Sequence, residues 1–216
     1  ADGNKSVYIK GKITMTNVIE FYFEFNSPFA YIAAHQIEEV AKKHGMEVSW
    51  RPISLGHVWK AIGATNVGPA GNPVKLKYQG KDSARFAKLA GLPLNRPAMH
   101  PVDAKLARLA FYRLSAKDPA LGKSFVKGVF DQFWGRGEDI TTADQLAGVM
   151  KNLGQDESEL EASLSDNEAK TAMIAFTQEA IDSGAFGMPW FKVGDEVFWG
   201  ADRIPHIDQY LASKTG

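Results

Sequence analysis

Cysteine is absent from the 216 residues of this chain. The chain can therefore form no disulfide, supply no thiolate ligand to a metal and offer no cysteine nucleophile. The absence does not decide the compartment, because a periplasmic protein can also lack cysteine. Any thiol chemistry at this chain must use a thiol that comes from outside it.

An excess of charge and a long apolar run are missing as well. The 25 lysines and arginines balance the 25 aspartates and glutamates, so the formal net charge is zero. This balance gives no electrostatic footprint for nucleic acid or for an anionic membrane. No apolar run approaches the roughly 20 residues that cross a bilayer. We therefore expect neither a nucleic-acid nor a membrane partner.

The N-terminal residues carry little structural signal. Residues 1–14 have no apolar central region and do not read as a signal peptide. Met15, just before a strong strand pattern, is a candidate native start, and residues 1–16 would then be a leader left by an expression tag. The alternative is that Ala1-Asp2 begins a mature chain after signal cleavage. We leave this segment out of the fold prediction.

The first strongly patterned segment predicts a β-α-β unit. Residues 18–25 alternate apolar and polar side chains, as a strand does. Ser27 and Pro28 then suit the cap and the first position of a helix whose apolar stripe runs to about residue 44. Residues 46–50 predict a second strand. Strands joined through a helix in this way should be parallel.

The middle of the chain reads as helices, with candidate caps at Thr141 and Asp156. After a turn-rich loop, helices are predicted at 75–90, 103–116, 120–134, 142–152, 157–164 and 168–183. Two short strands then flank a hairpin turn, and a last helix follows; these elements are predicted at 190–193, 197–199 and 202–212.

The order of these elements predicts the fold class. With the helical block removed, the order is βαβ followed by αββα, which is the thioredoxin order. A chain of this length, 44% hydrophobic, can build one or two compact domains. We therefore predict an α/β, thioredoxin-like fold with an inserted all-helical domain. The thioredoxin-like domain would comprise 17–55 and 168–216, and the inserted domain 56–167.

The turn before the first helix carries the most informative chemistry. Unpaired N–H groups and the helix dipole make a helix N-terminus favourable for an anion. Redox proteins of this architecture place Cys-x-x-Cys there, whereas this chain has Ser-Pro-Phe-Ala at 27–30, which excludes dithiol exchange. The Ser27 hydroxyl beside a positive helix end suits an external thiolate. The competing interpretation, the commoner one for such a serine, is a helix cap alone.

Two later segments suggest a site for a peptide-like ligand. Gly187-Met188-Pro189 precedes a strand, and a cis bond there would leave the Met188 backbone free to pair with an extended peptide such as glutathione. Alone this motif is weak, because most such prolines are trans. Trp199-Gly200-Ala201-Asp202 opens the last helix, where Asp202 either caps the helix or binds an ammonium group of a ligand. No histidines have metal-ligand spacing, so we predict no metal site.

Four motifs together resemble the 2-hydroxychromene-2-carboxylate isomerase family, DsbA-like proteins grouped with the kappa-class glutathione transferases. No single motif is specific, but their combination is, and their order and spacing match from about residue 18 to about residue 210. They are Phe-x-Phe-x-Ser-Pro-Phe-x-Tyr at 23–31, Asn-Val-Gly-Pro at 66–69, Gly-x-Pro at 187–189 and Phe-Trp-Gly-x-Asp-Arg at 198–203.

The resemblance implies a glutathione-dependent isomerase of a small aromatic, pyruvate-type compound. Ser27 would face the glutathione sulfur, and the tripeptide would be held by Met188, Trp199, Gly200, Ala201 and Asp202. The resemblance also implies a homodimer, and we expect a cytoplasmic location.

The residues around the aromatic substrate depart from the family pattern. The family uses a lysine, an Asn-Arg pair and a tyrosine, whose nearest counterparts here are Lys60, Asn72 and His100. Trp59 stands at the lysine position, and Pro73 replaces the arginine. Glutathione is therefore better supported than the particular substrate. Two alternatives stay open: a kappa-like glutathione transferase or peroxidase, and a non-catalytic thioredoxin-fold module that binds peptides beside Pro189.

Overall fold

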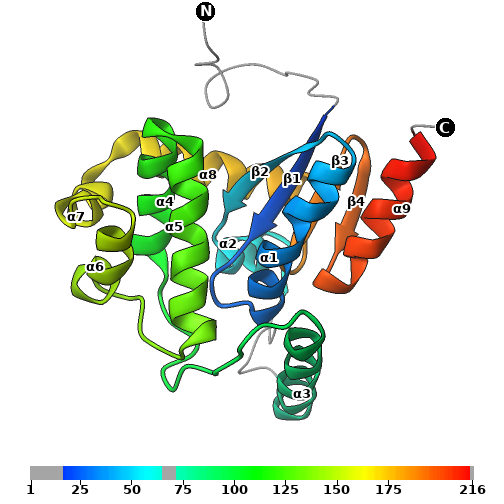
Figure 1. The fold of residues 1–216 in the computed structure, drawn as a ribbon, viewed down its shortest axis with the longest axis horizontal. Coiled ribbons are helices and arrows are strands. Elements are labelled where there is room, and N and C mark those ends of the chain that lie inside the picture. Colours follow the sequence, from blue (N-terminus) through cyan, green and yellow to red (C-terminus); the bar gives the residue numbers. More distant parts are fainter. Residues whose placement is uncertain (1–16, 65–71, 215–216) are drawn as a thin grey trace, which may run out of the picture.

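The computed structural model describes residues 17–64 and 72–214 (Figure 1). The predicted leader at 1–16 and the Asn-Val-Gly-Pro motif at 66–69 lie outside the described residues. Within the described ranges, no helix is long and apolar enough to cross a membrane.

A four-stranded sheet in the order β2-β1-β3-β4 forms the centre of the fold. β1 (Val18–Phe23) and β2 (Glu47–Pro52) are parallel and are joined through α1 (Pro28–Lys43), as predicted. β3 (Trp190–Val193) runs antiparallel to β1, and β4 (Glu196–Trp199) runs antiparallel to β3. The central strand β1 therefore leads straight into the turn that carries Ser27.

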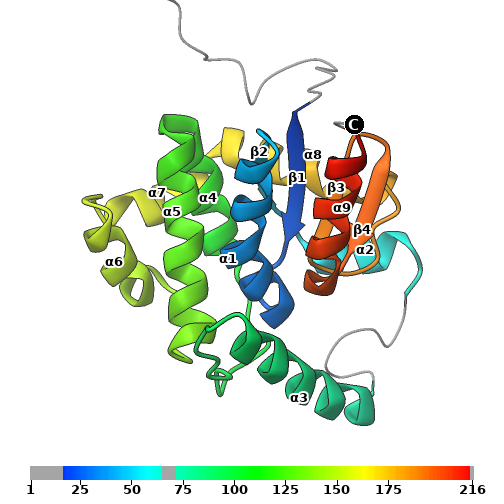
Figure 2. The ribbon, with the colours of Figure 1, turned by 45° about the vertical axis from the view of Figure 1, so that its right-hand side comes forward.

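Helices cover both faces of the sheet. α1 and α9 (Ile204–Lys214) lie on one face, and α8 (Asn167–Asp182) lies on the other (Figures 1 and 2). The predicted polar face of the first strand is therefore buried too. Tyr22 packs under α8 beside Ala180, and the strand ends at Phe23 rather than at residue 25. Alternation predicted the strand but could not show that its second face is covered.

The segment between β2 and α8 is helical, which confirms the predicted thioredoxin-like fold with a helical insertion (Figure 1). α4 and α5 pack against each other, and α4 also packs on α7 and α8. The domain boundaries at 17–55, 56–167 and 168–216 stay a prediction. The helices of the insertion are α2 (Leu55–Ala61), α3 (Pro73–Leu89), α4 (Lys105–Lys117), α5 (Pro119–Phe130), α6 (Ala143–Asn152) and α7 (Ser158–Ser165).

Three local predictions need correction. The helix predicted to reach residue 134 ends at Phe130 and continues as a π-helical turn, η1 (Asp131–Gly135). Thr142 caps α6, with its side chain accepting from the Gln145 N–H, whereas the Thr141 hydroxyl donates to Asp139. The last helix is preceded by a 3-10 turn, η2 (Ala201–Arg203). Ends of helices depend on such short-range competition and are hard to predict.

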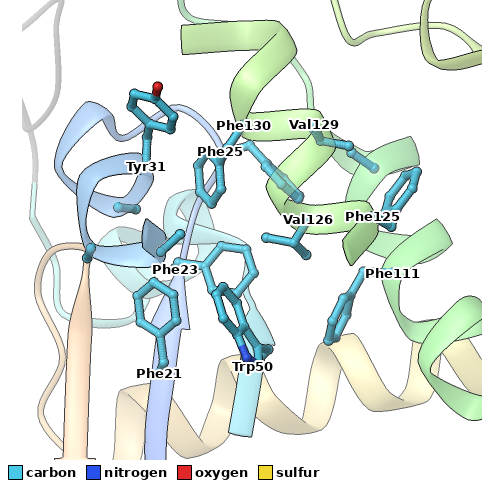
Figure 3. Close-up of a cluster of buried hydrophobic side chains, with 14 of the residues drawn as sticks. Phe21, Phe23, Phe25, Tyr31, Trp50, Phe111, Phe125, Val126, Val129 and Phe130 are labelled. Atoms are coloured by element: carbon cyan, nitrogen blue, oxygen red, sulfur yellow. The ribbon is translucent and has the colours of Figure 1, made fainter. Parts of the chain in front are cut away.

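A cluster of aromatic rings joins the sheet to the inserted helices (Figure 3). Phe23, at the end of β1, is fully buried. Its ring centroid lies 4.9 to 6.5 Å from those of Phe21, Phe25, Trp50, Phe111 and Phe130. Because the last two come from α4 and α5, the insertion packs directly on the strand that precedes Ser27.

Candidate active site

Ser27 stands at the N-terminus of α1. Its Oγ accepts a hydrogen bond from the Ala30 N–H at 3.1 Å, so Ser27 caps the helix as predicted. The same hydroxyl donates to the carbonyl oxygen of Met188 at 3.0 Å. Among the described residues, the N–H of Phe29 has no hydrogen-bond partner. The turn thus combines a half-buried hydroxyl with an available N–H at the positive end of a helix dipole.

Met188 faces Ser27 from the other end of the sequence. The Met188–Pro189 bond, whose isomer the sequence left open, is cis and leads directly into β3. The Met188 carbonyl is occupied by the Ser27 hydroxyl, so only its N–H lacks a partner within the described part of the chain. The Met188 backbone is therefore half free rather than wholly free, and a peptide that pairs with it must share or displace the serine contact.

The segment that runs from Trp199 to Asp202 lies beside the cis-proline. The Gly200 N–H donates to the Pro189 carbonyl at 3.0 Å. The Trp199 ring is 48% exposed and stands 4.7 Å from the ring of Phe186. Asp202 makes no capping hydrogen bond among the described contacts, and its carboxylate pairs with Arg203 at 3.2 Å. Because the Asp202 side chain is 43% exposed, a cationic group can reach it beside Arg203.

Gly187 permits the close approach of Trp199. A Cβ atom at Gly187 would lie 2.6 Å from Nε1 of Trp199 and 3.1 Å from its Cε2. Carbon atoms do not approach a ring that closely, so only glycine lets the indole lie against this backbone. The glycine before Met188 therefore sets the shape of this wall of the site.

The three predicted substrate residues differ in their placement. Lys60 is exposed on α2. Asn72 caps α3, and its Oδ1 accepts from the N–H groups of Val74 and Lys75. Neither residue is hydrogen-bonded to Ser27 or Met188 among the described contacts. His100 is the nearest to the turn, since its Nε2 lies 2.9 Å from the Asn26 carbonyl oxygen.

Two parts of the inserted segment, η1 and the loop before α4, hold the residues just before Ser27. Trp134 Nε1 donates to the Phe25 carbonyl at 2.8 Å. The Asn26 side chain makes two hydrogen bonds to the Val102 backbone, at 2.8 and 2.9 Å. The sequence prediction included no contact between Trp134 and this turn. The π-helical turn that presents Trp134 has no reliable sequence signal, although such turns often occur at functional sites.

Comparisons with known proteins agree with this geometry. Residues 18–212 match the family described as the DSBA-like thioredoxin domain. The chain belongs to this DsbA-like family. Because it has no cysteine, this DsbA-like chain cannot carry out dithiol–disulfide exchange with residues of its own.

Its sequence relatives include isomerases and glutathione transferases. It is 35% identical to the 2-hydroxychromene-2-carboxylate isomerase of Pseudomonas putida, over 87% of this chain and 90% of that one. The isomerase of Sphingobium xenophagum is 30% identical, over 91% and 99%. Glutathione S-transferase kappa 2 of Caenorhabditis elegans is 26% identical, over 90% and 92%.

Solved structures place the fold in the same group. A 2-hydroxychromene-2-carboxylate isomerase superposes with a TM-score of 0.82 at 32% identity, covering 92% of this chain and 96% of that one. The cytosolic disulfide reductase DsbM of Pseudomonas aeruginosa gives a TM-score of 0.62 at 16% identity, covering 92% and 97%. The second likeness concerns the fold alone.

His100 is held as a neutral ring in this DsbA-like chain. The Asn26 carbonyl only accepts, so Nε2 must carry the proton, and Nδ1 can then accept from Arg96 at 3.3 Å. Burial lowers the pKa of His100; the hydrogen bond to Asn26 opposes this shift, and the Arg96 charge adds to it. The geometry gives His100 a role in holding the turn, while contact with a substrate stays a prediction.

We expect the His100 ring to titrate below the ordinary histidine value of about 6.5 in an NMR pH titration. Because the unfolded chain then binds the proton more readily, this residue's contribution to stability is complete above about pH 6.5 and is lost as the pH falls through the folded pKa. The free energy of unfolding should therefore depend less on pH in His100→Asn than in the native chain, between roughly pH 7 and 5. Titration at or above the ordinary value would contradict the neutral-ring assignment.

Proposed function

We propose that this chain is a glutathione-dependent isomerase of the 2-hydroxychromene-2-carboxylate isomerase type. One observation carries the proposal: in a chain without cysteine, the Ser27 hydroxyl at a helix N-terminus faces Met188, the residue before a cis-proline. The isomerase relatives at 30–35% identity support the same reaction. We also propose a cytoplasmic homodimer, on the family resemblance alone.

The residues at the site suit a thiol-bearing peptide. The Ser27 hydroxyl and the Phe29 N–H lie where a thiolate would gain from the helix dipole. The free N–H of Met188 can pair with a peptide carbonyl. When bound, glutathione would supply a thiolate that adds reversibly to a conjugated double bond and so allows rotation about it.

The chain's own residues would bind and orient the two molecules. Ser27 would donate its hydroxyl proton to the sulfur in place of the Met188 carbonyl. Asp202, exposed in η2, would take the ammonium group of the tripeptide, with Trp199, Gly200 and Ala201 alongside. The residues proposed around the substrate carboxylate and carbonyl are Lys60, Asn72 and His100.

A kappa-like transferase is the second candidate, favoured by the transferase relative from Caenorhabditis elegans. The assay that decides between the two follows the interconversion of 2-hydroxychromene-2-carboxylate isomers and the concentration of free glutathione in the same reaction. An isomerase needs glutathione but leaves its concentration unchanged. Stoichiometric loss of glutathione would favour a transferase. Binding of peptides without glutathione, and no turnover, would favour a non-catalytic module.

Gly187→Ala is expected to weaken glutathione binding by roughly tenfold, because the added methyl displaces Trp199 and shifts the wall beside Met188. Gly148→Ala is the matched control, since nothing lies within 4 Å of its Cβ position in α6. That control should bind normally and gain about 1 kcal/mol of stability as a helix substitution. Equal affinities in the two variants would remove Trp199 from the proposed site.

A further inference from the structure

Glu24 lies three residues before Ser27 and is only 5% exposed. Its backbone carbonyl accepts a hydrogen bond from the Ser27 N–H at 3.0 Å. Its carboxylate oxygens accept from Nη1 of Arg108 at 3.0 and 2.9 Å. Glu24 thus contacts the Ser27 turn through its backbone, and the inserted helix α4 through the pair of its side chain with Arg108.

The start of a second helix, α2, lies close to the Glu24 carboxylate. Burial raises the pKa of Glu24, whereas the Arg108 charge and the N–H groups of Leu55 and Phe25 lower it. Leu55 is the first residue of α2, and the Ser54 side chain makes no capping hydrogen bond there. The backbone joins the end of β1 to this helix, because the Ile53 N–H, just before α2, donates to the carbonyl of Phe23 at 2.9 Å.

α2 leads back to the site. Trp59 Nε1 donates to the Phe186 carbonyl at 3.1 Å, two residues before Met188. The Met188 carbonyl in turn accepts from the Ser27 hydroxyl. The contacts therefore close a ring that runs from Ser27 through the backbone of Glu24 and Phe23 to α2, and through the Phe186–Met188 segment back to Ser27.

Stability gives no reason for a buried ion pair at this position. Well-packed apolar side chains in place of such a pair are often neutral or stabilising. The guanidinium is also incompletely satisfied, since Arg108 Nε is buried without a hydrogen-bond partner among the described residues. A role in holding the geometry of the turn explains why the pair is there.

We propose that Glu24, held by Arg108, is a positioning residue that fixes the Ser27 turn against α2 and the inserted helices. The pair keeps the Ser27 hydroxyl and the Met188 backbone at the spacing that bound glutathione requires. This inference rests on the proposed function for its effect on the ligand, and on the ring of contacts for its effect on the chain.

The test uses the double variant Glu24→Met/Arg108→Met, which removes both charges and keeps the volume apolar, so that the chain folds. We expect glutathione to bind about tenfold more weakly and the ultraviolet absorbance of the bound thiolate to fall. The single variant Glu24→Asp keeps the charge and should retain most of the affinity. The matched control is Arg113→Met/Glu159→Met, which removes an ion pair of 2.7 Å from the same helix α4. It should bind as the native chain does.

Amide hydrogen exchange separates this inference from the proposed function. Faster exchange at 25–30 and 185–189 in the double variant, but not in the control, supports positioning even if the native chain binds no glutathione. Absence of glutathione binding by the native chain would count against the proposed function alone. Unchanged exchange in both segments, or native glutathione affinity in the folded double variant, would overturn the positioning role.

Discussion

Replacing Ser27 by alanine is expected to lower kcat/KM for the isomerisation by about 100-fold, the usual cost of removing one hydrogen-bond donor from a developing charge. The hydroxyl is the polar side-chain group that the structure places at the α1 N-terminus facing Met188. Without it, a bound thiol would keep the helix dipole and the Phe29 N–H but would lose its donor. Ser27→Thr, which retains a hydroxyl, should recover part of the rate.

Ser27 also caps α1, so a control must separate catalysis from stability. Thr142 caps α6 in the inserted helices, with its side chain accepting from the Gln145 N–H. Thr142→Ala should lose about 1 kcal/mol of stability, as Ser27→Ala should, but keep its full rate. If Ser27→Ala lost stability and kept its rate, the serine would be a helix cap alone.

Phe23→Ala is expected to lower the free energy of unfolding by about 4 kcal/mol. The ring is fully buried among five aromatic neighbours from the sheet, from the segment just after β1, and from α4 and α5 (Figure 3). Its removal leaves a cavity that rigid rings cannot close, in addition to the lost transfer free energy. Denaturant unfolding measures the difference directly.

An exposed aromatic residue provides the comparison for this core variant. Tyr78 on α3 is 60% exposed, and Tyr78→Ala should change stability by no more than about 0.5 kcal/mol. A loss below about 1 kcal/mol in Phe23→Ala would mean that the sheet and the inserted helices do not share a packed core.

Local patterns predicted those parts of the fold that depend on neighbours in sequence. The alternation at residues 18–25, the Ser27-Pro28 helix start and the Gly194-Asp195 hairpin turn each act over a few residues. Burial of the second face of β1 depends on α8, which is more than a hundred residues away, so alternation placed Tyr22 and Glu24 on a polar face. The Glu24–Arg108 pair could not be read from spacing for the same reason.

At the site too, local features could be predicted from the sequence, whereas contacts between distant residues could not. Ser27 was predicted from its helix start, but the hydrogen bond to Met188 spans 161 residues, and only the family resemblance brought the two together. The sequence carries no signal for the indole N–H contacts of Trp134 and Trp59, because these contacts depend on a π-helical turn and on the docking of α2. The substrate residues Lys60, Asn72 and His100 rest on the resemblance and stay a prediction.

Calorimetric titration of reduced glutathione into the native chain, with Ser27→Ala beside it, tests the glutathione site at Ser27 most directly. We predict saturable binding of one glutathione per chain, weakened in the variant, because the Ser27 hydroxyl and the α1 N-terminus hold the thiol. Absence of binding at millimolar glutathione, or equal binding by both proteins, would contradict the proposed site.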